Sequence, residues 1–125
     1  MTKKELKYYL RIYYKIREDV KNKKISSLVI LYGRKRKVLI PKWVYCLEDI
    51  LLIIRNRGGE FDVIINKFYF GGLTDKRILV DEPLSESSYY RLKRKLEESI
   101  YELLILYGYV SEDEILNQMV TNSFF

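Results

Sequence analysis

The amino-acid sequence predicts a mainly α-helical fold, with two helices joined by a short turn in its C-terminal half. Two observations support this prediction. Apolar residues recur at intervals of three and four along most of the chain, and serine, threonine, glycine and proline stand where helices should begin and end. The chain has 125 residues, the size of one ordinary domain. We divide it at Gly58 and Gly59 into a basic helical region, 1–58, and a second region, 59–125, that contains the two joined helices and a last helix.

The distribution of charge differs between these two regions. Region 1–58 holds 16 lysines and arginines against 5 acidic residues, a net charge of +11. Region 59–125 holds 7 against 12, a net charge of −5. The basic region can attract phosphates through its overall field, whereas in the acidic region a contact to a polyanion must come from a locally basic stripe.

Several classes of function receive no support from the composition. Cys46 is the only cysteine and there is no histidine, so an internal disulfide and the usual metal sites are excluded. The sequence also lacks a glycine-rich phosphate loop and a nucleophile elbow. We expect neither an enzyme nor a bound cofactor. Because no run of about 18 apolar residues and no signal peptide is visible, we expect a cytoplasmic protein without membrane contact.

The first predicted helix covers 3–24. Its apolar residues are spaced three and four apart and form one seam, which consists of Leu6, Tyr9, Tyr13, Ile16 and Val20. This is the spacing of a coiled coil, although three turns of seam are few for a stable one. The seam can either pack on the rest of the chain or pair two copies in a homodimer, and the pattern leaves both uses open.

Segment 27–40, SLVILYGRKRKVLI, consists of two apolar, β-branched runs around a basic turn that begins at Gly33. It predicts a β-hairpin, and a short helix followed by a basic loop is the alternative. In both cases the chain presents four consecutive cations, which are Arg34, Lys35, Arg36 and Lys37. They either form a solvated turn or contact the phosphates or minor groove of DNA, where they would release counterions.

The next predicted helix begins at Pro41, a residue that suits the first turn of a helix. It runs through Trp43 and Ile54 and is stopped by Gly58 and Gly59. Apolar side chains cover most of its circumference. We therefore expect it at the centre of the core.

A three-part pattern follows from Glu60 onward. A helix with an apolar inner face ends at Gly71 and Gly72, and Thr74 can then cap a short helix, TDKRILV, that points Ile78 and Leu79 inward. After a turn over 81–84, Ser85 can cap a long helix that ends at Gly108. The buried stripe of this long helix is predicted to be Tyr89, Leu92, Leu96, Ile100, Leu103 and Tyr107.

The start of the long helix carries polar and basic residues that lie off the buried stripe, namely Ser87, Ser88, Tyr90, Arg91, Arg94 and Lys95. Two helices joined by a short turn, the second of which begins with such residues, is the arrangement that inserts a recognition helix into the major groove. Arginine can bind guanine through O6 and N7, and serine and tyrosine can bond bases or phosphates. We therefore expect these six residues to bind double-stranded DNA. A basic run alone also occurs on solvated helices, so the helix and turn before it carry the prediction.

The segment FDVIINKFYFGGLTDKRILVDEPLSESSYYRLKRKLEESIYEL resembles the fourth conserved region of bacterial sigma factors and, more closely, phage late transcriptional activators of the RinA and ArpU type. The matching features are KFYFGG before the turn, Thr74 at the start of the short helix and SESSYYRLKRK at the start of the long one. The resemblance implies a sigma-like helix-turn-helix that activates phage packaging and morphogenesis genes in a bacterial host cell. It assigns to DNA the residues Ser87, Ser88, Tyr90, Arg91 and Arg94.

The last predicted helix begins at a capping box formed by Ser111 and Glu114. It either packs on the body or offers its acidic start to RNA polymerase. A different class of function also remains open, in which the chain is a protein-interaction module that binds its partner through the tyrosine-rich first helix and has no specific affinity for DNA. Salt-dependent DNA binding separates the two classes.

Overall fold

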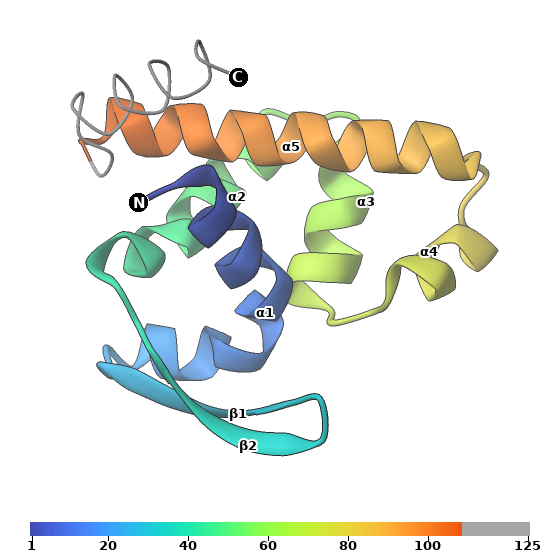
Figure 1. Cartoon of the computed structure of the whole chain (residues 1–125). Coiled ribbons are helices and arrows are strands. Elements are labelled where there is room, and N and C mark those ends of the chain that lie inside the picture. The colour runs from blue at the N-terminus through green and yellow to red at the C-terminus, as the bar shows by residue number, and fades with distance from the viewer. Residues whose placement is uncertain (109–125) are drawn as a thin grey trace, which may run out of the picture.

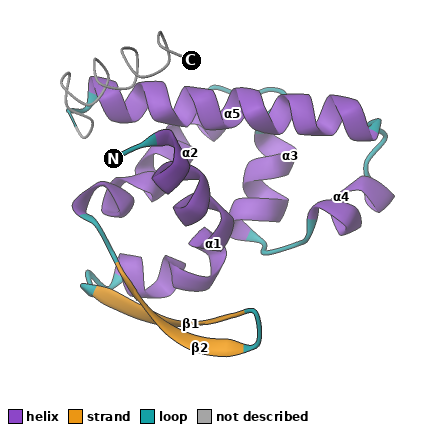
Figure 2. Ribbon diagram, viewed as in Figure 1, coloured by secondary structure: helices purple, strands orange, loops and turns teal. Residues whose placement is uncertain are grey.

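The structure is a computed structural model that describes residues 1–108. Figures 1 and 2 show a mainly helical molecule with one two-stranded antiparallel hairpin, as the sequence predicts. The predicted helix that starts at Ser111 lies outside the described residues. The elements in chain order are α1 (Lys3–Lys21), β1 (Ser26–Leu31), β2 (Arg34–Leu39), the 3-10 helix η1 (Lys42–Cys46), α2 (Leu47–Asn56), α3 (Asp62–Ile64), the π-helical segment η2 (Ile65–Phe70), α4 (Asp75–Asp81) and α5 (Glu86–Leu106).

Helix α1 begins at a capping box, in which the Thr2 hydroxyl accepts a hydrogen bond from the Glu5 backbone and the Glu5 side chain accepts one from the Thr2 backbone. The predicted seam is buried except at Tyr9, which is half-buried and donates its hydroxyl to the Leu39 carbonyl oxygen at 2.7 Å. Of the two uses that the sequence leaves open, the seam therefore packs on the body of its own chain. The helix ends earlier than predicted because the backbone turns at Lys23, which adopts a φ of 57°.

The hairpin confirms the first of the two alternatives for segment 27–40, but its turn is not basic. The turn residues are Tyr32 and Gly33, both with positive φ, and Leu31 pairs with Arg34 across them. This is the two-residue turn that matches the twist of paired strands, and glycine adopts it without strain. The four consecutive cations consequently lie along strand β2 rather than in the turn.

The two faces of the hairpin differ. Ser27, Val29 and Val38 are buried on the face that packs towards α1. Because side chains alternate along a strand, their neighbours Leu28 and Lys37 lie together on the opposite, exposed face. The hairpin is therefore anchored by a few buried residues and exposes most of the others.

The helix predicted from Pro41 is confirmed only in part. Residues Lys42–Cys46 form a 3-10 helix with Trp43 and Val44 buried, and the α-helix begins at Leu47. It ends at Asn56 before the glycine pair, as expected. Its residues Leu47, Ile50, Leu51 and Ile54 are buried in the core.

One hydrophobic core spans both halves of the chain. Helix α1 lies at its centre and contacts β1, η1, η2 and α5, while α2 also contacts α5. In Figure 1, α5 extends across one side of the molecule and the hairpin lies on the other, with α1 between them. The glycine pair at 58 and 59 is thus a bend in the chain, and regions 1–58 and 59–108 complete each other's core.

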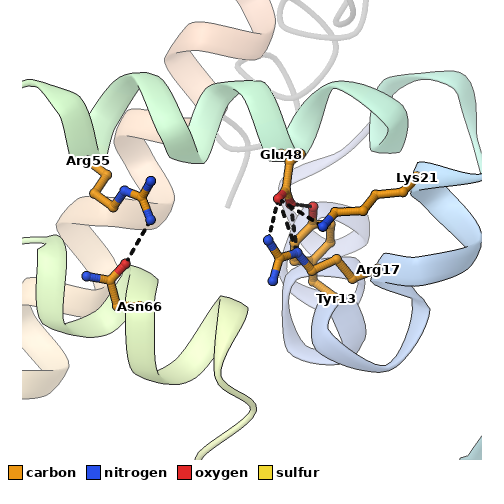
Figure 3. Close-up of polar contacts among 6 residues, drawn as sticks. All are labelled: Tyr13, Arg17, Lys21, Glu48, Arg55 and Asn66. Atoms are coloured by element: carbon orange, nitrogen blue, oxygen red, sulfur yellow. Dashed lines mark hydrogen bonds and ion pairs between the residues drawn. The ribbon is translucent and has the colours of Figure 1, made fainter.

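A partly buried ionic network joins α1 to α2 (Figure 3). The Arg17 guanidinium donates to the Glu48 carboxylate at 2.5 and 3.0 Å, and the Tyr13 hydroxyl donates to the same carboxylate. Burial opposes the ionisation of Glu48, but these hydrogen bonds outweigh it and hold the pKa of Glu48 below its ordinary value. Arg17 also lies over the Phe70 ring, 4.1 Å from its centre, so the network reaches η2.

Candidate nucleic-acid interface

Helices α4 and α5 each begin at a side-chain cap, and both caps are at the predicted residues. The Thr74 hydroxyl accepts a hydrogen bond from the Arg77 backbone at 3.3 Å, and the Ser85 hydroxyl accepts one from the Ser88 backbone at 3.2 Å. Each cap satisfies a backbone N–H that the first turn of a helix leaves free. The sequence therefore locates the start of both helices correctly.

The angle between these helices is held by Asp75, in the first turn of α4. Its carboxylate accepts a hydrogen bond from the Tyr89 hydroxyl at 2.6 Å and two from the Lys93 ammonium at 3.0 and 3.1 Å. Burial, then the bond to Asp75, raises the pKa of Tyr89, so the phenol remains a donor. Lys93 also lies 3.6 Å from the centre of the Phe68 ring. One partly buried cluster thus links α4, α5 and η2.

The predicted DNA-binding residues of α5 lie on its outer side, with one exception. Ser87, Tyr90, Arg91, Arg94 and Lys95 are exposed. Helical spacing places Ser87, Arg91 and Lys95 on one stripe, with Arg94 beside it. Ser88 is half-buried and accepts a hydrogen bond from the Ser85 hydroxyl at 2.8 Å, so it belongs to the cap of the helix.

The buried side of α5 differs from the predicted buried stripe at the C-terminal end of the helix. Tyr89, Leu96 and Ile100 are buried, and Leu92 and Leu103 are half-buried. The predicted burial of Tyr107 is wrong, because this residue follows the last residue of the helix and has 53% of its surface exposed. Tyr101 and Leu104, which the prediction omits, are buried instead, because the helix crosses α1 and α2 at this end and presents a wider face to them.

A groove between α1 and α5 adjoins the exposed side of α5. Its volume is about 530 Å³, and Tyr90 and Arg94 line it from α5. From α1 it is lined by Lys7 and Arg11, which the sequence reasoning missed. The signal that could have found them is a lysine or arginine at every fourth position, 3, 7 and 11, which one face of a helix presents together.

The hairpin cations lie apart from this surface. Arg34, Lys35, Arg36 and Lys37 are all exposed, and Figure 1 places their strand on the opposite side of α1 from α5. The structure brings the α5 residues together with Lys7 and Arg11, but it does not bring the hairpin cations to them. The chain therefore presents two separate basic surfaces.

Within residues 1–108, no group of three or more cysteine, histidine or acidic side chains is placed to hold a metal ion. Over the same residues, no helix has the length and apolar character needed to cross a membrane. Comparison of the chain with protein-family models, with curated proteins and with solved structures found no match.

Proposed function

We propose that the chain is a sequence-specific DNA-binding transcription regulator that reads the major groove with the N-terminal half of α5. The observation that carries the proposal is the two-sided character of that helix: Tyr89 and Leu96 are buried, while Arg91, Arg94 and Lys95 are exposed and free of ion pairs with other described residues. A recognition helix needs such a fixed inner side and a basic, accessible outer side.

The length and the hydrogen-bonding groups of the residues at the start of α5 suggest a role for each. Arg91 and Arg94 are long, planar donors that can bind a guanine edge through two hydrogen bonds. The first turn of α5, at Ser85 and Ser87, offers backbone N–H groups and a favourable dipole to a phosphate. Because α4 is tied to α5 through Asp75, the two helices present this surface as one rigid unit.

We further propose, on the resemblance to phage late activators, that the target is a promoter and the outcome is activation of packaging and morphogenesis genes. RNA polymerase and a second copy of the chain are the additional partners in this proposal, and the bacterial cytoplasm is where they would meet. The hairpin cations would add contacts to the DNA backbone that do not depend on sequence.

A protein-interaction role for the tyrosine-rich α1 has less support. Tyr13 is buried and Tyr8 and Tyr9 are half-buried, and an edge-to-face contact joins Tyr9 to Trp43. Most of the aromatic surface of α1 is thus occupied by its own chain. Tyr14, with 53% of its surface exposed, is the most accessible of these tyrosines.

The proposal is tested by selecting duplexes from a random DNA library with the full chain and sequencing what is retained. A DNA-binding regulator is expected to enrich one motif, and the enriched duplex should bind at least about a thousandfold more tightly than an unrelated one. Retention of duplexes without an enriched motif would contradict specific recognition. Retention of none would remove DNA as the ligand.

A further inference from the structure

The groove between α1 and α5 is lined by more hydrogen-bond donors than the fold uses. Lys7 and Arg11 from α1 and Arg94 from α5 line it, and none of the three forms an ion pair with another described residue. Three unpaired cations around one cavity repel each other, which costs free energy. An anion in the groove would relieve that repulsion.

A second, independent observation comes from the floor of the groove. Tyr69 of η2 lines it with only 1% of its surface exposed, and its hydroxyl has no hydrogen-bond partner among the described residues. Burial, reinforced by the nearby Glu97 carboxylate, raises the pKa of Tyr69, so the group stays a protonated donor. A buried donor without an acceptor is costly and calls for a partner.

The remaining lining residues indicate the class of ligand. Glu97 is the one acidic residue there; burial raises its pKa, whereas the charges of Lys7 and Lys93 lower it, so this single carboxyl group offsets only part of the positive charge of the groove. Tyr90 and Phe68 add aromatic rings, and the volume of about 530 Å³ is that of a small-molecule pocket. A phosphate attached to a sugar and a base combines the charge and the flat ring that such a lining binds.

We propose that this groove is a binding site for a phosphate ester, with Lys7 and Arg11 holding the phosphate and the Tyr90 ring lying against the attached sugar or base. A phosphate oxygen that enters the floor supplies the acceptor that the Tyr69 hydroxyl lacks. The ester can come from a free mononucleotide or from one unit of a DNA backbone. The site does not require that α5 recognise a base sequence.

The proposal is tested by isothermal titration of the full chain, at constant ionic strength, with inorganic phosphate, adenosine monophosphate and adenosine. Phosphate and the monophosphate should bind, the monophosphate more tightly, and adenosine should not. Arg11→Gln should weaken both by about tenfold. Arg57→Gln, which removes the same charge at an exposed position beyond α2, is the matched control and should change neither.

Tyr69→Phe separates a ligand-binding role from a structural one. It should weaken phosphate binding by about fivefold without lowering the midpoint of thermal unfolding, because the hydroxyl it removes has no partner in the described fold. Unchanged affinity in Tyr69→Phe or Arg11→Gln would overturn the proposal, as would an equal loss in Arg57→Gln or absence of phosphate binding.

Titration of a duplex in the presence of saturating adenosine monophosphate identifies the source of the phosphate. Competition would place the DNA backbone in the groove, and independent binding would make a free nucleotide its ligand. Both outcomes support the phosphate site. Neither depends on the enrichment of a DNA motif, so the two proposals fail separately.

Discussion

The ring of Tyr14 lies against the backbone of Gly72, so close that a Cβ atom at position 72 would be 2.4 Å from the ring carbons. Gly72 also has a φ of 71°, which other residues adopt only with strain. The contact joins α1 to the link between η2 and α4. At this contact the packing of the N-terminal half of the chain depends on a residue of the C-terminal half.

Gly72→Ala should therefore destabilise the protein more than a change in φ preference explains. Gly58 is the matched control, because its φ is 73° and no atom lies within 4 Å of a Cβ built there. We expect Gly58→Ala to cost about 1 kcal/mol from backbone strain alone, and Gly72→Ala to cost about 1 kcal/mol more, because the Tyr14 ring, which is 53% exposed, has to move away from the new methyl group. Urea unfolding of both variants measures the difference, and equal losses would contradict the close contact.

Replacement of Arg91 or Arg94 by alanine should weaken binding to the selected duplex by about 1–3 kcal/mol each. Both side chains are exposed, so the fold should remain intact, which circular dichroism can check. Arg57→Ala, at an exposed position beyond α2, is the control and should bind like the parent in a mobility-shift assay. If both α5 variants also bind like the parent, α5 does not read the DNA.

Neutral replacement of Arg34, Lys35, Arg36 and Lys37 should lower affinity for all duplexes by the same factor. Exposed cations on a strand contact phosphates rather than base edges in this proposal, so the slope of log affinity against log salt should flatten by roughly 0.9 for each phosphate that is no longer neutralised. Filter binding at four or five salt concentrations gives the slope. An unchanged slope would assign these residues to a solvated surface.

Asp75→Asn should weaken the link between α4 and α5, because an amide is a weaker acceptor for Tyr89 and Lys93 than a carboxylate. We expect a loss of stability of about 1.5–3 kcal/mol. DNA affinity should fall as well, even though the substitution removes a negative charge that repels DNA. Improved DNA binding would show instead that removal of a negative charge matters more than the helix angle.

The Glu48 network predicts a specific dependence of stability on pH. Because the pKa of folded Glu48 lies below its ordinary value of 4.5, its ionisation favours the folded state above that pH. This contribution is lost as the pH falls through the folded pKa. Glu48→Gln should thus cost about 1.5–3 kcal/mol at pH 7 and much less in acid.

Glu97→Gln should have the opposite effect on stability at pH 7. Burial raises the pKa of folded Glu97, so its ionisation opposes folding as the pH rises through that pKa. Glutamine should therefore stabilise the protein at pH 7 and have little effect in acid. Guanidinium unfolding at several pH values compares the two variants, and the same sign for both at pH 7 would refute the assignment.

Local signals in the sequence account for the helix starts and the buried seam. Thr74 and Ser85 are small polar residues directly before apolar periodicity, and their hydroxyls bond the backbone as such residues do at any helix start. The seam of α1 follows from spacing alone. These features depend only on neighbours within one turn, so a single sequence carries them.

The missed features depend on contacts between distant segments. The groove exists because α1 packs beside α5, and the sequence around Lys7 does not show that Arg94 lies near it. The π-helical winding of η2 and the burial of Tyr101 likewise reflect packing against other elements. The hairpin turn lies one step earlier than predicted because Tyr32, an unusual residue at positive φ, occupies it with Gly33.

The central position of α1 also has a consequence for how the chain acquires its structure during synthesis. Lys3 lies 5.2 Å from the centre of the Tyr101 ring, so α1 packs against α5, which follows it in the chain and leaves the ribosome later. At about 5–20 residues per second, α5 follows α1 by several seconds. Strand β1, η1 and η2 can cover part of α1 earlier, but the surface around Leu6 that faces α5 remains uncovered through that interval, which makes it a ligand for chaperones until α5 is complete.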